Sequence, residues 1–300
     1  MTDERIFEKA CLLQLATKAW PGVKKLDSKK LAELGSLEWL SGGQKRLIEP
    51  TIVAPPKATV SAVRKYLDGR SCPFPIKGLN LIHKDLIQDV DDYLNEQKAV
   101  FWEQVQEVAA VYENAIAAAK PHLIRIGVYN ENDYPRDITR KYDFSWHYVM
   151  IQTPGKNTIL TAEVYERERQ KYVDMMEEAR HETALALRFE LQDLVKKMVE
   201  RLTSDGGEPK IFRDTLVTNF DEFFGVINER NLFDDSEITE LVGKAREILK
   251  GVSPDVLRNV DAIRENVRRD MNKLQQVVSE SIMDMPRRRL RLDPKMEEAA

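Results

Sequence analysis

Two stretches of helical periodicity limit the folds that this chain can adopt. In the first, between residues 83 and 120, apolar side chains recur at steps of three, four or seven. They are Leu86, Val90, Leu94, Phe101, Val105, Val108, Tyr112, Ala115 and Ala119. A helix of this length spans roughly 55 Å at about 1.5 Å per residue, which is more than a small globular core needs. Pro121 is expected to end it.

The second stretch runs from about residue 161 to residue 204, where Asp205-Gly206-Gly207 ends it. Its apolar positions are Tyr165, Tyr172, Met176, Ala179, Thr183, Ala186, Leu187, Leu191, Leu194, Met198 and Leu202. Glu, Arg and Lys crowd the other faces. An apolar stripe this narrow must be buried on another helix, which predicts a coiled-coil-like stalk.

Further helices are predicted over residues 211–229 and 236–250, the latter capped by Asp234 or Asp235. Ser253-Pro254-Asp255 has the sequence of a helix start and predicts one helix that continues to about residue 285. Shorter helices are expected over residues 28–34 and 56–67.

Two segments have the alternation of half-buried strands. Residues 11–20 read CLLQLATKAW, and residues 143–152 read DFSWHYVMIQ, with Phe144, Trp146, Tyr148 and Met150 on one face. We expect these two strands to pair and close a small sheet. A short extended edge piece is expected at residues 73–76, since proline cannot donate to a central ladder.

These patterns predict an α+β protein that is mostly α, with a small antiparallel sheet and long coiled-coil-like helices. Charged residues make up 32% and hydrophobic residues 42% of the 300, which is typical of a helix-rich globular chain. We predict a mixed α/β head over residues 1–155, which includes the long helix 83–120. A helical stalk over 156–285 and a mobile basic tail over 286–300 follow.

The charge is unevenly distributed. Residues 1–84 carry fifteen Lys and Arg against eight Asp and Glu, a balance of +7, while residues 161–300 carry twenty-four against thirty. A basic surface with interspersed aromatics suits single-stranded nucleic acid. The candidate nucleic-acid-binding residues are Lys24, Lys25, Lys29, Lys30, Lys45, Arg46, Arg64, Lys65 and Trp20. The competing interpretation, which we favour, is that Trp20 belongs to the core and the lysines only lie on the solvent-exposed faces of helices.

Residues 40–44 read LSGGQ, which resembles the signature loop of ATP-binding-cassette ATPases. That loop indicates an ATPase only when the chain also contains a phosphate-binding G-x-x-x-x-G-K-[ST] sequence. None of the thirteen glycines begins such a sequence. We therefore interpret the segment as a loop in which Gly42-Gly43 supplies permissive backbone angles.

Other catalytic motifs are incomplete. His181-Glu182 begins an H-E-x-x-H zinc motif, but Leu185 occupies the position of the second histidine. Asp193, Glu208 and Lys210 imitate a D…ExK nuclease pattern, so a metal-dependent nuclease remains an alternative. The acidic group around Asp91 is interpreted as a solvated helix face. We predict no catalytic residues, no metal and no cofactor.

Two cysteines, Cys11 and Cys72, are too few for a disulfide framework or a zinc site. The charged start MTDERIFEKACLL does not fit a signal peptide, and no apolar stretch approaches the length of a membrane span. The expected location is the cytoplasm.

Several local sequences resemble an uncharacterised family, a domain of unknown function found in bacteria, phages and integrated elements. The resemblance covers roughly residues 6–205 and rests on AWPGVKKL at 19–26, KRLIEP at 45–50, FPIKG at 74–78 and DFSWHYVMIQTPG at 143–155. The resemblance implies a mixed α/β head with long helices and no assigned activity. It also implies that members of the family are encoded near AAA+ ATPases of mobile elements. The chain departs from the family where Ser41-Gly42-Gly43-Gln44 replaces a plainer basic turn.

Taken together, the sequence predicts a non-enzymatic, self-associating interaction or assembly component of a phage or mobile-element system. The expected partners are further copies of the chain, bound through the long helices, and an AAA+ ATPase. A single-stranded DNA-binding or annealing protein is the alternative that uses the basic head.

Overall fold

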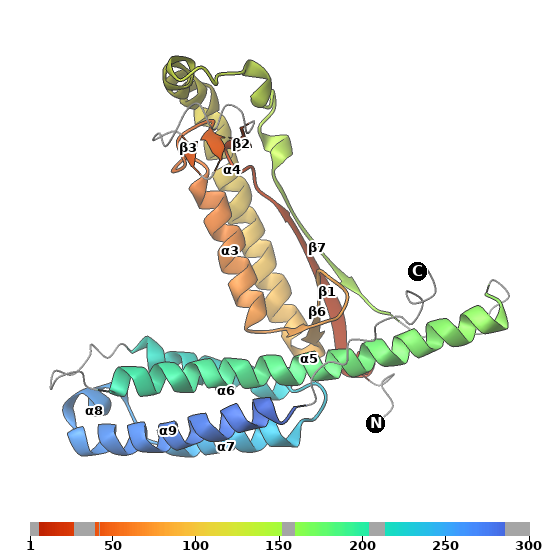
Figure 1. The fold of residues 1–300 in the computed structure, drawn as a ribbon, viewed down its shortest axis with the longest axis vertical. Coiled ribbons are helices and arrows are strands. Elements are labelled where there is room, and N and C mark those ends of the chain that lie inside the picture. The colour runs from red at the N-terminus through yellow and green to blue at the C-terminus, as the bar shows by residue number, and fades with distance from the viewer. Residues whose placement is uncertain (1–5, 27–39, 42, 152–159, 204–213, 286–300) are drawn as a thin grey trace, which may run out of the picture. The chain divides into compact units, whose positions relative to one another are not determined.

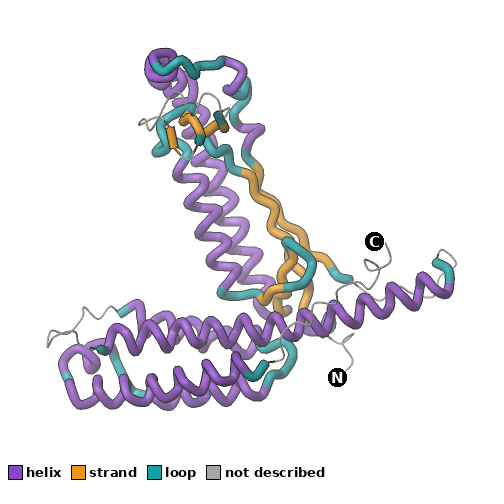
Figure 2. The backbone as a smooth tube through the Cα atoms, viewed as in Figure 1, coloured by secondary structure: helices purple, strands orange, loops and turns teal. Residues whose placement is uncertain are grey.

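A computed structural model describes residues 6–26, 40–41, 43–151, 160–203 and 214–285. The chain forms two compact units, Met1–Met175 and Met176–Ala300. The boundary predicted from the sequence lies at residue 155, whereas the units divide inside the helix Ala162–Leu202 (α5). The described chain is mostly helical with small antiparallel sheets, so the predicted fold class is confirmed (Figure 2).

The first unit contains a four-stranded antiparallel sheet with the strand order β5-β6-β1-β7. The strands are β1 (Ala10–Lys18), β5 (Cys72–Pro73), β6 (Leu79–His83) and β7 (Asp143–Val149), and a single helical turn, α1 (Ile6–Lys9), precedes β1. β1 pairs with β7 over its last seven residues, from Leu12 opposite Val149 to Lys18 opposite Asp143. The predicted pairing of these two strands is therefore confirmed.

Two helices cover one face of this sheet: α3 (Ala54–Asp68) and α4 (Ile87–Arg125), which lie side by side in Figure 1. Alternate residues of β1, Cys11 and Leu13, join their buried core together with Phe144 of β7. The apolar stripe predicted along the first long helix is buried from Val90 to Ala119. Short 3-10 turns connect the elements: η2 (Lys84–Leu86), η3 (Glu131–Asp133) and η4 (Thr139–Lys141).

The prediction that Pro121 ends the long helix is wrong, because α4 continues through it to Arg125. Proline removes one hydrogen bond, yet Leu123 in the following turn is fully buried. The helical backbone stops just before Gly127, whose φ of 68° is left-handed. The Val128 N–H donates to the Leu123 carbonyl over 2.9 Å, the hydrogen bond of a glycine-terminated helix.

A second, three-stranded sheet has the order β2-β4-β3, formed by β2 (Val23–Lys25), β3 (Leu40–Ser41) and β4 (Gln44–Arg46). The interpretation of residues 40–44 as a loop is wrong for Leu40, Ser41 and Gln44, which lie in the paired strands β3 and β4, where Ser41 pairs with Gln44. Gly43 has a left-handed φ of 77°. The interpretation of Gly42-Gly43 as turn residues therefore holds at Gly43, while Gly42 and the helix predicted at 28–34 lie outside the described residues.

The second unit is a helical bundle. It contains the part of α5 after Met175 together with α6 (Thr215–Arg230), α7 (Ser236–Leu249), α8 (Pro254–Asn259) and α9 (Asp261–Met283). The α5 stripe from Leu187 to Leu202 packs in one core with Phe220, Leu241 and Met271 of the other helices. The Leu187–Leu202 part of the predicted apolar stripe is therefore buried on helices of the same unit.

Two buried arginines fasten α5 to its neighbours. Arg188 pairs with Asp235 and Glu237, each over 2.8 Å, and Arg230 of α6 pairs with Glu190 over 2.6 Å. Both arginine side chains are 4% exposed, so these buried charges depend on their ion pairs to offset the loss of solvation. These ion pairs fix how the helices of this unit meet.

The predicted helix starts are confirmed where a capping side chain is present. Asp235 accepts hydrogen bonds from two backbone N–H groups at the start of α7, and Ser253 accepts one at the start of α8. The single helix predicted from residue 254 to 285 is wrong, because Val260 adopts an extended backbone between α8 and α9. The chain turns there, so that Leu257 and Val267 both enter the same core.

Cys11 and Cys72 are buried in the first unit and are not joined by a disulfide bond. Over the described ranges, no helix is both long and apolar enough to cross a lipid bilayer. The basic tail predicted at 286–300 lies outside the described residues.

Candidate anion-binding pocket

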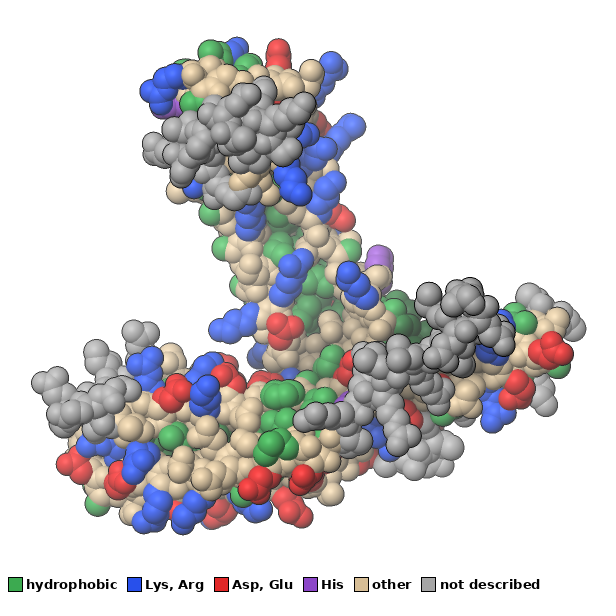
Figure 3. Space-filling model, in the orientation of Figure 1, with side chains coloured by type: hydrophobic (Ala, Val, Ile, Leu, Met, Phe, Trp, Pro, Cys, Tyr) green, Lys and Arg blue, Asp and Glu red, His purple; other side chains and the backbone are tan. Residues whose placement is uncertain are grey.

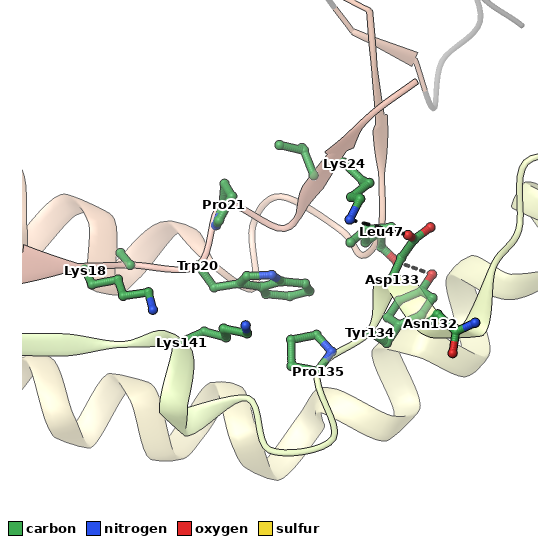
Figure 4. Close-up of a pocket in the computed structure, with 12 residues that line it drawn as sticks. Lys18, Trp20, Pro21, Lys24, Leu47, Asn132, Asp133, Tyr134, Pro135 and Lys141 are labelled. Atoms are coloured by element: carbon green, nitrogen blue, oxygen red, sulfur yellow. Dashed lines mark hydrogen bonds and ion pairs between the residues drawn. The ribbon is translucent and has the colours of Figure 1, made fainter. Parts of the chain in front are cut away.

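A cavity of about 390 Å³ opens in the first unit where β1, β2 and the segment before β7 meet (Figure 4). Its walls come from three parts of the chain that are distant in sequence: residues 18–24, Leu47, and residues 132–141. Its volume lies within the range of about 300–1,000 Å³ that is common for ligand sites. The pocket is therefore large enough for a small ligand or one unit of a polymer.

Trp20 lines the middle of the pocket but belongs to the core. Only 7% of the residue is exposed, and its ring meets Tyr112 edge to face with centroids 5.7 Å apart. The Tyr112 hydroxyl donates to the Pro135 carbonyl over 3.2 Å, which ties the wall opposite Trp20 to α4. The indole thus forms a rigid apolar wall, and too little of it is exposed to act as a stacking platform for a base.

Lysines surround this wall. Figure 4 shows Lys18 and Lys141 at one end of the indole and Lys24 at the other. Lys18 is the last residue of β1, and Lys141 lies two residues before Asp143, which is the β7 partner of Lys18. The β1–β7 register therefore brings these two side chains together. Both are exposed, and neither has an acidic partner in the described part of the chain.

The acidic group of the pocket, Asp133, is already neutralised. Its carboxylate lies 2.5 Å from the Lys45 Nζ and 3.8 Å from the Lys24 Nζ. Lys45 is only 6% exposed and also donates to the Val128 carbonyl over 2.5 Å. This buried ion pair holds η3 and the loop after α4 against β4. It therefore fixes the wall of the pocket that residues 132–135 form.

Tyr134 completes that wall. Its hydroxyl donates to the Leu47 carbonyl over 3.0 Å. Burial raises the pKa of this phenol well above its usual range, with smaller contributions from neighbouring tyrosines and Asp133. The hydroxyl therefore stays protonated near neutral pH and serves as a structural donor.

The pocket is suited to holding an anion. Its three lining lysines, with Lys45 behind the wall and Asp133, leave a local charge of +3 on a concave surface whose apolar wall excludes some of the solvent. Lys and Arg side chains are also visible over the same end of the first unit in Figure 3. Exposed ammonium groups bind phosphates as point charges, without a fixed geometry.

The structure brings together only part of the predicted nucleic-acid site. Trp20 and Lys24 line the pocket, and Lys45 lies behind its wall. Lys25 is exposed on β2 beside Gln44, the residue before Lys45. Arg46 is half-buried on β4. Arg64 and Lys65 are exposed on α3, where Arg64 donates to Thr17 over 3.0 Å. Lys29 and Lys30 lie outside the described residues.

Sequence reasoning missed Lys18 and Lys141. A signal was available, because Lys18 lies within one of the two strands that we expected to pair and Lys141 lies just before the other. Only the register, Lys18 opposite Asp143, shows that they reach the same place.

The other candidate groups are not among the residues that line this pocket. Asp193 of α5 is exposed and pairs with Lys197 over 2.5 Å, while Glu208 and Lys210 of the nuclease pattern lie outside the described residues. Within the described ranges, no three His, Cys, Asp or Glu side chains are placed to hold a metal ion. The interpretation of Asp89, Asp91 and Asp92 as a solvated acidic face is confirmed for Asp89 and Asp92, which are exposed. It is wrong for Asp91, which is half-buried and accepts hydrogen bonds from Trp146 over 2.9 Å and Tyr148 over 3.2 Å.

Replacing Lys45 tests the buried ion pair that shapes the pocket. Lys45→Met leaves the Asp133 carboxylate buried without its closest cation, so we expect the free energy of unfolding to fall by about 3 kcal/mol. Lys45→Met/Asp133→Asn should recover most of this loss. Urea denaturation measures both changes, with Lys25→Met on the exposed neighbouring strand as the matched control. A Lys45→Met protein as stable as this control would contradict the assignment.

Comparison with known proteins gives one match. The family described as "Protein of unknown function (DUF3150)" matches residues 7–202, which include all of the pocket. No curated protein and no solved structure matches the chain.

Proposed function

The chain belongs to the family of proteins of unknown function DUF3150, and we propose that it is a non-enzymatic, self-associating binding component whose ligand is single-stranded nucleic acid. The pocket at Trp20 carries this proposal. Three lysines converge there from separate elements, and two of them have no acidic partner among the described residues.

The surroundings of the pocket fit a flexible polyanion better than a small acid. Lys25, Arg64 and Lys65 are exposed elsewhere on the same unit, so the cationic surface extends beyond the cavity. A single strand can follow such a surface, because its backbone bends to bring successive phosphates to separated lysines. The buried Trp20 leaves the phosphates, rather than the bases, as the groups that are recognised, which predicts little sequence preference.

Self-association and an AAA+ ATPase of a phage or mobile element as partner remain part of the proposal. The α5 stripe from Leu187 to Leu202 is buried within its own unit. Association between copies therefore requires a different surface from the stripe that the sequence suggested. Co-purification of the tagged chain with an AAA+ ATPase that is encoded near it tests whether that ATPase is a partner.

Charge reversal tests the nucleic-acid proposal. Lys18→Glu/Lys141→Glu should weaken binding to a fluorescent oligo-dT at low salt by at least tenfold, since two phosphate contacts become repulsive. The slope of log affinity against log salt should become shallower by roughly 1.4, at about 0.7 per phosphate. Fluorescence anisotropy across a salt series measures both.

The matched control is Lys77→Glu/Lys84→Glu, which makes the same charge change at exposed positions of the same unit outside the pocket. Duplex DNA and heparin are parallel ligands that separate single-strand binding from general polyanion binding. The proposal would be contradicted if both double variants weakened oligo-dT binding equally, or if the unmodified chain did not bind oligo-dT at low salt.

A further inference from the structure

The two edges of the four-stranded sheet are protected very differently. β5 is only two residues long and contains Pro73, which has no backbone N–H to donate. Short length and proline are features by which edge strands avoid pairing with other chains. At the opposite edge, β7 has seven residues, DFSWHYV, with no proline, no lysine and Asp143 as its one acidic residue. This edge lacks the usual protection.

The edge of β7 is also held in a strand conformation. β1 pairs with it along its whole length, and Phe144 is 1% exposed in the core beneath it. Trp146 and Tyr148 on the same face both donate to Asp91 of α4. These contacts fix the backbone, so little ordering entropy is lost when another strand pairs with it. Figure 1 shows β7 along the outer margin of the sheet.

We propose that β7 pairs antiparallel with β7 of a second copy of this chain, which joins two four-stranded sheets into one of eight strands. The inference rests on the proposed self-association and names the surface that performs it. An isologous dimer of this kind needs a surface that is complementary to itself about a two-fold axis. Main-chain hydrogen bonds would supply much of the affinity, as in other cases of strand addition.

The sequence of β7 meets that requirement. Pairing over all seven residues centres the axis on Trp146 and sets each residue opposite another on the same face. Phe144 then lies opposite position 148 of the second copy, an aromatic cross-strand pair. Ser145 lies opposite position 147, and Asp143 lies opposite position 149, a valine. No two like charges meet, so the strand is self-complementary.

Ser145 and His147 allow a direct test, because they lie on the face away from Asp91 and are half-buried and exposed, respectively. Ser145→Lys/His147→Lys sets lysines opposite each other across the proposed interface and should dissociate the dimer. Ser145→Lys/His147→Glu sets a lysine opposite a glutamate and should retain it. Light scattering after size exclusion measures the mass against 34.6 kDa for one chain, and circular dichroism checks the fold.

Phe189→Ser is the comparison variant, because Phe189 on α5 is 51% exposed and offers a competing apolar surface. The inference predicts twice the single-chain mass for the unmodified protein, for Ser145→Lys/His147→Glu and for Phe189→Ser, and one chain for Ser145→Lys/His147→Lys.

A single-chain mass for the unmodified protein would overturn both the self-association and this inference. A dimer that survives Ser145→Lys/His147→Lys, or that is lost equally in both double variants, would overturn the β7 pairing while leaving self-association standing. Loss of the dimer in Phe189→Ser alone would assign the interface to α5 instead.

Discussion

The antiparallel pairing of β1 with β7 on the surface of α4 is the interaction on which the first unit depends. It buries Phe144 and Leu13 in one core, and each such side chain contributes about 1.5–3 kcal/mol relative to exposure. The same register sets Lys18 beside the residues that lead into β7, so the core pairing also builds the cationic end of the pocket. Since β7 is the last strand of the sheet, no other strand among the described residues pairs with its outer edge.

The pocket illustrates how a buried charge can support a binding surface without binding anything itself. Lys45 looked like a ligand-binding residue in the sequence, but its ammonium group is used internally by Asp133 and the Val128 carbonyl. With Asp133 neutralised in this way, the remaining lysines present an uncompensated positive field. The proposed recognition of a polyanion requires only these exposed ammonium groups.

The periodicity of apolar residues predicted those helices and strands whose buried side chains recur at regular intervals along the sequence. The stripe of α4 and the pairing of β1 with β7 could be read directly, because alternation and helical spacing report which side chains face the core. Asp235 and Ser253 marked helix starts for an equally local reason. Pro121 could not be judged locally, since the burial of Leu123 outweighs the hydrogen bond that proline removes. The break at Val260 likewise depends on tertiary packing.

The candidate site was less predictable because charge alone does not report burial. Lys45 and Lys24 look alike in the sequence, yet one is buried and the other has a side chain that is 58% exposed. Lys18 and Lys141 become neighbours only through the strand register.

Lysine footprinting with a single strand tests the central claim most directly, namely that this register creates a phosphate-binding pocket. The full-length protein is acetylated with and without oligo-dT, and mass spectrometry measures the extent of modification at each lysine. The account predicts that the oligonucleotide protects Lys18, Lys24 and Lys141 while Lys77 and Lys84 react as before. Protection of Lys77 and Lys84 to the same extent, or no protection of Lys18 and Lys141 when the strand is bound, would contradict it.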